Sequence, residues 1–365
     1  MESSREGCLA VSERVTLLTL ARDLGVSRAT VSNAYNRPDQ LSTALRSRIL
    51  ARAEQLGFAG PDPMARGLRS GRTGAVGVLI DQGLSYAFSD PTAVLYLDGL
   101  ATELQGDGLG LLLHAGTGSR TDAELVRAAA VDAWVIRSLP EDEPAVEAAV
   151  AQQRPMVVLD QPDLPGVPLV GIDDAGGAAA ATRHLVDLGH RAVSVLTMPL
   201  RPDGYQGLVD AARERYATYP VMRNRLCAVE QTLSAAGVDW VDVPVVECAV
   251  NDLDTGALGA YELLHRTPAP TAILALSDQL ALGALRAAQE MGVTVPGTCS
   301  VVGFDDAPGA STAVPPLTTV AQPLRERGQA AGAIVRALLA GEPASTPARL
   351  PVSLVLRDST APPQR

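Results

Sequence analysis

The sequence predicts an all-α helix-turn-helix head followed by an α/β body of two lobes, each built on a doubly wound parallel sheet. Three observations lead to this fold class. The chain has 365 residues, more than one typical domain needs. Apolar residues recur at helical spacing within residues 15–60. From residue 73 to residue 365, short apolar runs alternate with alanine-rich stretches, the pattern of repeated β-α units.

The head, residues 15–60, is predicted to contain three helices. The first carries four apolar residues on one face and ends before Gly25, which suits a left-handed turn. Ser27 is a good N-cap for a second helix over residues 28–36, and a third helix follows at about residues 43–56. Two short helices joined by a glycine-containing turn and braced by a third form a helix-turn-helix.

Charge is divided unevenly between the two parts of the chain. The formal net charge is −11, yet residues 1–72 hold 11 arginines against 7 acids, whereas residues 73–365 hold 19 arginines against 34 acids. A basic head on an acidic body can bind phosphate locally while the body is repelled from DNA. The charge pattern therefore favours a nucleic-acid partner for the head alone.

The string LARDLGVSRATVSNAYNRPDQLS in the head resembles the DNA-binding domain of the LacI/GalR (lactose repressor) family of bacterial regulators. The later stretches HLVDLGHRAVSVL and PPLTTVAQP resemble that family's effector domain, which is shared with periplasmic sugar-binding proteins. The resemblance implies a sequence-specific transcriptional regulator, a repressor or alternatively an activator. A small, sugar-like effector bound in a periplasmic-binding-protein-like body would control it, as an inducer or as a corepressor.

The resemblance places the second helix of the head in the major groove of DNA. Carried over by position, the base-reading residues are Arg28, Ala29 and Asn33. Arginine can pair with guanine, alanine can contact a thymine methyl group, and asparagine can pair with adenine. Many relatives have arginine where Asn33 stands, which predicts a different base preference here. Thr30 and Ser32 are expected to contact phosphate or to pack within the head.

Residues 61–72, PDPMARGLRSGR, are predicted to connect head and body as a short basic helix. The resemblance implies a hinge helix in which Arg66 contacts DNA and Leu68 wedges between base pairs in the minor groove. The alternative is a flexible basic linker with Leu68 packed on the neighbouring domain. Residues 1–14 are expected to form a flexible tail.

The body is expected to divide into two lobes because its β-α pattern starts again after Gly171. By analogy with the family, the chain crosses between the lobes near Gly171, near residues 319–322 and near residues 343–348. The expected N-lobe comprises residues 73–170 and 323–345, and the expected C-lobe comprises residues 171–320 and 346–357. Ligands bind at the carboxyl ends of such strands, so the cleft between the lobes is the expected effector site.

Seven residues of the body are candidates for effector contact. Three follow from the family motifs, and four follow the predicted strands of the first lobe: Arg225, Ser277 and Asp305; Asp81, Tyr86, Phe88 and Asp160. An arginine fork suits vicinal hydroxyls or a carboxylate, and aspartate accepts hydrogen bonds from ligand hydroxyls or amines. The segment 198–221 looks longer than the usual connection; it either shapes effector choice or decorates the surface.

Other classes of protein fit the sequence poorly. Neither a cofactor fingerprint nor a catalytic or metal-binding motif is present, so an enzyme, a cofactor and a metal are not expected. The sequence lacks a transmembrane run and a signal peptide, and its four cysteines are widely spaced, which favours a cytoplasmic protein with reduced thiols. A secreted solute-binding protein would have no use for the head. A homodimer on a pseudo-palindromic double-stranded operator is expected.

Overall fold

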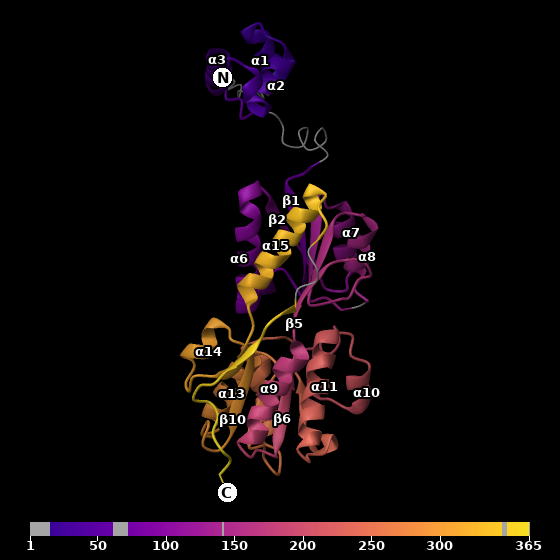
Figure 1. Cartoon of the computed structure of the whole chain (residues 1–365), viewed down its shortest axis with the longest axis vertical. Helices are drawn as coiled ribbons and strands as arrows, with labels where there is room; N and C mark the ends of the chain where they lie inside the picture. Colours follow the sequence, from indigo (N-terminus) through magenta and orange to yellow (C-terminus); the bar gives the residue numbers. More distant parts are fainter. Residues whose placement is uncertain (1–14, 61–71, 141, 345–348, 365) are drawn as a thin grey trace, which may run out of the picture. The chain divides into compact units, whose positions relative to one another are not determined.

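The computed structural model describes residues 15–60, 72–140, 142–344 and 349–364. The chain divides into two compact units, Met1–Thr73 and Gly74–Arg365 (Figure 1). The predicted tail, and the connecting segment with Arg66 and Leu68 apart from its last residue, lie outside the described residues.

The head contains three helices around a small core. Leu20, Val31 and Ile49, one from each helix, are fully buried there. Each helix begins at a hydroxyl side chain that accepts a bond from a backbone N–H of its first turn, which satisfies one otherwise unpaired donor. The helical elements are α1 Leu17–Leu24, α2 Arg28–Asn36, η1 Pro38–Gln40 and α3 Thr43–Gln55.

The turn between α1 and α2 depends on Gly25. Its φ of 66° lies in the left-handed region, and its N–H is directed at the carbonyl groups of Ala21 and Arg22. A side chain would be strained in this conformation, whereas glycine adopts it freely. The predicted helix-turn-helix is confirmed, and α2 has the predicted bounds.

The N-lobe of the body is a six-stranded parallel sheet in the order β12-β5-β4-β3-β1-β2. Helices α6 and α15 pack on one face, and α7 and α8 on the other (Figure 1). The strands are β1 Ala75–Asp81, β2 Gly110–Gly116, β3 Ala133–Arg137, β4 Met156–Leu159, β5 Leu169–Ile172 and β12 Arg349–Leu350. The helices are α5 Tyr86–Ser89, α6 Pro91–Leu104, η2 Gln105–Asp107, α7 Arg120–Ala128, α8 Pro144–Ala151 and α15 Leu324–Ala340.

Two glycines allow α6 and α15 to pack closely. A Cβ atom at Gly99 would lie 2.1 Å from the carbonyl oxygen of Arg325, and one at Gly328 would lie 2.2 Å from that of Tyr96. Real Cβ atoms do not approach backbone so closely, so any larger residue would push the helices apart. This contact joins a helix from the start of the body to one near its end.

The C-lobe is a seven-stranded sheet in the order β13-β11-β10-β9-β6-β8-β7, in which only the edge strands β7 and β13 run antiparallel to their neighbours. Helices α9 and α11 pack on one face, and α12 and α13 on the other. The strands are β6 Val193–Thr197, β7 Gly207–Leu208, β8 Val245–Glu247, β9 Ala272–Ala275, β10 Ser300–Asp305, β11 Thr318–Ala321 and β13 Ser353–Val355. The helices are α9 Asp174–Asp187, α10 Ala211–Arg215, α11 Pro220–Ala235, η3 Trp240–Asp242, α12 Leu253–Leu264, α13 Asp278–Glu290 and α14 Pro308–Thr312.

The chain crosses between the lobes three times: at Asp173, at residues 322–323 and at residues 351–352. The first two crossings fall within a few residues of their predicted places. The third comes later than the predicted 343–348, because β12 pairs with β5 in the N-lobe sheet before the chain leaves. This strand has only two residues, too few to give an alternating pattern in the sequence.

Candidate functional site

One face of α2 is free of the head's own core. Arg28 and Ala29 are exposed in the first turn, and Asn33, one turn later, is partly exposed. Ala29 and Asn33 are four residues apart, so they lie on the same side of the helix. The three predicted base-reading residues are therefore accessible.

Two polar side chains of α2 take part in the head's own hydrogen bonds. Ser32 is 7% exposed, and its oxygen accepts a bond of 3.1 Å from Nδ2 of Asn36. The hydroxyl group of Thr30 lies 2.8 Å from Oγ of Ser27 at the helix start. These contacts favour a packing role over a phosphate contact for Ser32 and Thr30.

Asn33 has a partner that the sequence reading missed. Its Nδ2 donates to Oε1 of Gln40 at 3.2 Å, across the turn that follows α2. An asparagine that pairs with adenine donates from this same nitrogen, which carries two N–H groups, so one of them can remain on Gln40 while the other faces the base. Gln40 thereby helps to set the orientation of Asn33.

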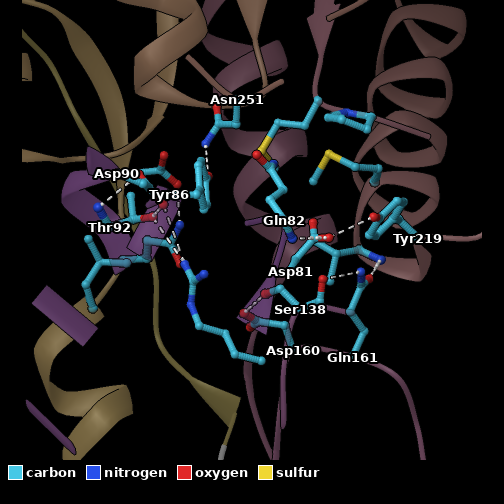
Figure 2. Close-up of a pocket in the computed structure, with 18 of the residues that line it drawn as sticks. Asp81, Gln82, Tyr86, Asp90, Thr92, Ser138, Asp160, Gln161, Tyr219 and Asn251 are labelled. Carbon is cyan, nitrogen blue, oxygen red and sulfur yellow. Dashed lines mark hydrogen bonds and ion pairs between the residues drawn. The ribbon is translucent and has the colours of Figure 1, made fainter. Parts of the chain in front are cut away.

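A cavity of about 110 Å³ lies between the two lobes of the body (Figure 2). Its wall combines residues that follow the carboxyl ends of parallel strands with residues from the crossing at 322–323 and the start of α15, as expected for such sheets. The polar and charged lining residues are Asp81, Gln82, Tyr86, Asp90, Thr92, Arg137, Ser138, Asp160, Gln161, Tyr219, Arg225, Asn251, Asp305, Gln322 and Arg327. The apolar ones are Met198, Pro199, Val221, Met222 and Leu324.

Five of the seven predicted effector residues line this cavity: Asp81, Tyr86, Asp160, Arg225 and Asp305. Phe88 and Ser277 do not. Phe88 is 71% exposed, because its neighbour Ala87 takes the buried position on the short helix α5. Ser277 is fully buried; it caps α13 and donates to Oδ1 of Asn251 at 2.5 Å. Asn251, which the sequence reading missed, reaches the cavity in its place.

Backbone strain is concentrated around the cavity. Gln82, Ser138, Asp160 and Asp305 each come at or just after the end of a strand and each have a positive φ. Residues other than glycine pay a cost in this conformation, which persists only where the surrounding structure enforces it, typically at functional sites. The strain therefore supports a binding role for this end of the sheets.

Arg225 is held rigidly at the cavity wall. It is 4% exposed, Nε donates to Oδ1 of Asp174 at 2.8 Å, and Nη1 donates to the carbonyl oxygen of Leu276 at 2.8 Å. Its Cζ lies 3.7 Å from the ring centroid of Phe304, close enough for a cation–π interaction. An arginine has five N–H groups, so donors remain for a ligand.

A chain of polar contacts joins the lobes through the second crossing. Arg327 forms an ion pair with Asp160 and donates to Gln322, which in turn donates to Asp305. Burial lowers the pKa of Arg327 to about 10, because desolvation disfavours the charged guanidinium. A ligand that contacts Asp160 and Asp305 would touch both ends of this chain.

Asp305 is paired with a second buried acid, Asp278, which is outside the cavity lining. The backbone N–H of Asp278 donates to Oδ2 of Asp305 at 3.3 Å, and the Asp278 carboxylate accepts bonds from Thr319 and from the N–H of Ala307. Burial raises the pKa of Asp278 to about 6. Burial and the neighbouring Asp278 raise the pKa of Asp305 well above its usual value.

We expect Asp305→Asn to flatten the pH dependence of stability between about pH 4 and the raised pKa of its neighbour Asp278, about 6. Both pKa values are raised in the folded chain, so the pair stabilises the fold below the unfolded pKa, and this contribution disappears as the pH rises through the folded pKa. Removing one acid should therefore make the body progressively more stable than the wild type as the pH rises through this range.

The measurement is the free energy of unfolding by urea at a series of pH values. The exposed acid Asp163 provides the control variant Asp163→Asn, which should keep the wild-type slope. Parallel curves for Asp305→Asn and the wild type would show that the pair is not the source of the slope.

Three hydrogen bonds cross the cavity from one lobe to the other (Figure 2). Oη of Tyr219 lies 3.2 Å from Oδ1 of Asp81. The N–H of Val221 donates to Oε1 of Gln161 at 2.8 Å, and Nδ2 of Asn251 donates to Oη of Tyr86 at 3.3 Å. Carboxylates, guanidinium groups and amides at these positions suit a small ligand with many hydroxyl groups.

Among the described residues, no group of three metal-ligating side chains could hold a metal ion. No helix in the described ranges is long and apolar enough to cross a membrane. The described cysteines are unpaired: Cys227 is exposed, and Cys248 and Cys299 are buried.

Known proteins resemble both units of the chain. Residues 182–360 match the family described as periplasmic binding protein-like domain. The HTH-type transcriptional regulator Rv3575c of Mycobacterium tuberculosis is 43% identical over 326 residues, which cover 88% of this chain and 90% of that protein.

Two solved structures share the architecture. The Lac repressor dimer bound to operator and the anti-inducer ONPF has a TM-score of 0.78 and 26% identity, over 96% of this chain and 100% of that one. The complex of the transcriptional regulator CelR with cellobiose has a TM-score of 0.67 and 28% identity, over 95% and 100% of the two chains. These relatives are regulators of transcription rather than enzymes.

Proposed function

Because the chain belongs to the LacI family of helix-turn-helix transcriptional regulators, we propose that it is a repressor whose operator affinity is set by a small, sugar-like effector bound between the lobes of its body. The observation that best supports binding of a small effector is the polar cavity. It is bordered by both lobes and lined with carboxylates, arginines and amides at the carboxyl ends of parallel strands. The cellobiose complex of CelR supports a sugar as the class of ligand.

The DNA-binding part rests on α2. Arg28, Ala29 and Asn33 are accessible on this helix, and the proposal assigns them to base edges in the major groove. A homodimer would present two such helices to the half-sites of a pseudo-palindromic operator. From the resemblance of residues 61–72 to the family's hinge helix, Arg66 remains a proposed DNA contact and Leu68 a proposed minor-groove wedge.

Coupling between effector and operator requires unequal affinities. The effector can change operator binding only if it binds the DNA-competent and DNA-incompetent arrangements of the body differently. An inducer binds the incompetent arrangement better, and a corepressor binds the competent one better. Hydroxyl groups of the effector are expected to donate hydrogen bonds to Asp81, Asp160 and Asp305 and to accept a hydrogen bond from Arg225.

The test of the DNA-binding proposal is selection from randomised duplexes with full-length protein, for the wild type and for Asn33→Arg. The wild type should enrich a palindromic site, and the variant should change the preferred base at one position of each half-site by about 1–3 kcal/mol of discrimination. Ala44→Arg adds the same charge at an exposed position on α3 and should leave the base preference unchanged. Without an enriched sequence at any salt concentration, the head would not be a specific reader.

The enriched duplex then serves as the probe for the effector. Neutral sugars and polyols are titrated into the protein–duplex complex, with sugar acids and sugar phosphates in parallel. A neutral sugar that changes operator affinity in the wild type but not in Asp305→Asn would support the proposed site. Placing the duplex upstream of a reporter gene separates repression from activation.

A further inference from the structure

The segment 198–221, here called the strap, connects β6 to the start of α11 and includes the short edge strand β7 and the helix α10. Its two ends are joined, because the N–H of Thr218 donates to the carbonyl oxygen of Leu200 at 2.8 Å. Leu200 is fully buried, and Tyr219 is 6% exposed in the core on the same face of the sheet. The strap is therefore a closed loop whose base is part of the C-lobe core.

A buried acid anchors the strap to the sheet. Glu247, at the end of β8, is fully buried and accepts a bond of 2.8 Å from the N–H of Leu200. The same carboxylate binds Nε and Nη2 of Arg213 at 2.5 and 2.8 Å, and Arg213 also pairs with Asp203 within the strap. Removing one partner of a buried ion pair is strongly destabilising, so this anchor fixes the strap against the sheet.

The anchored strap reaches the other lobe at its end. Tyr219 and Val221 make two of the three bonds that cross the cavity, to Asp81 and to Gln161 (Figure 2). Asp81 is the last residue of β1, and Gln161 follows β4, so the strap contacts the N-lobe rim at two points on either side of β3. Its first residues, Met198 and Pro199, line the same cavity.

We propose that the strap is an inter-lobe latch: Tyr219 and Val221 favour the closed arrangement of the lobes, and Arg213 and Glu247 act as positioning residues that hold them in place. Both bonds join protein to protein, so the latch needs no ligand to form. The effect of the latch on operator binding rests on the proposed function. In that function, the latch would set the fraction of protein whose lobes have the arrangement that the effector prefers.

The test is hydrogen–deuterium exchange of the full chain without added ligand, in the wild type and in Tyr219→Phe. This change removes the hydroxyl group and keeps the ring in the core. Losing one such hydrogen bond should speed exchange of the Val221 amide and of amides at residues 81–86 in the opposite lobe by roughly two- to tenfold. The matched control is Tyr216→Phe, because Tyr216 is an exposed residue of the strap. It should change the exchange rate neither of the Val221 amide nor of the amides at residues 81–86.

Faster exchange confined to residues 216–222 would overturn the proposal, because it would show local loosening rather than opening of the cleft. If Tyr219→Phe lowers the thermal midpoint, Gln161→Leu provides the test from the N-lobe side. It removes the acceptor of the Val221 N–H, so it must also speed exchange of the amides at residues 81–86, and unchanged exchange there overturns the proposal as well. Neither DNA nor effector enters this experiment, so its outcome is separate from that of operator selection.

Discussion

Replacing Arg225 by leucine is expected to lower the free energy of unfolding of the body by about 3 kcal/mol or more. The change leaves the Asp174 carboxylate, whose side chain is 12% exposed, without its guanidinium partner. It also removes the donor to the carbonyl oxygen of Leu276 and the cation over Phe304. Unfolding by urea, followed by the fluorescence of Trp134 and Trp240, measures the change, because both tryptophans of the chain lie in the body.

Two further variants separate the ion pair from general damage. Arg223→Leu changes an exposed arginine of the same helix and should cost less than about 1 kcal/mol. The double variant Arg225→Leu/Asp174→Asn should be more stable than Arg225→Leu alone, because it no longer contains an uncompensated buried charge. Equal losses for Arg223→Leu and Arg225→Leu would contradict the role assigned to Arg225.

Leu20→Ala is expected to unfold the head and abolish operator binding while leaving the body intact. Leu20 is fully buried in a core of only six buried residues, all within the head. A buried leucine-to-alanine change costs about 2–5 kcal/mol, which is comparable to the whole stability of so small a domain. The affinity for the selected duplex falls with the fraction of heads that stay folded, so a loss that exceeds the head's own stability by about 3 kcal/mol should lower it about a hundredfold.

Leu18→Ala provides the control on the same helix. Leu18 is 47% exposed, so its truncation should leave operator affinity within about threefold of the wild type, as for most surface changes. Limited trypsin digestion adds a readout that needs no DNA: Leu20→Ala should expose the arginines of α2 and α3 to rapid cleavage. Wild-type resistance of the head to trypsin in Leu20→Ala would refute the expectation.

Local signals explain why the elements could be predicted closely. Ser27 as N-cap and Pro38 as breaker fix the ends of α2 within a few residues of chain, so no tertiary information is needed. Continuous apolar runs such as that of β1 are typical of strands covered on both faces. The strand β12 carried no such signal, since two residues show no period, and the third crossing was misplaced for that reason.

The site was only partly predictable. The rule that ligands bind at the carboxyl ends of strands identified Asp81 and Asp160, and it would also have indicated Arg137 at the end of β3. Arg327 carried no comparable signal, because it reaches the cavity from the first turn of α15, whose position depends on the crossing before it. The prediction for Phe88 was wrong, because a helix of four residues is too short for its sequence to show which side faces inward.

The sharing of each lobe between distant parts of the chain has a consequence for synthesis. The head is complete in its first sixty residues, so it can fold as soon as they leave the ribosome. Neither lobe can complete its folding at that stage of synthesis. The N-lobe requires α15 and β12, and the C-lobe requires β13 at residues 353–355. A nascent chain therefore carries a folded DNA-reading head long before it has a pocket through which that head could be controlled.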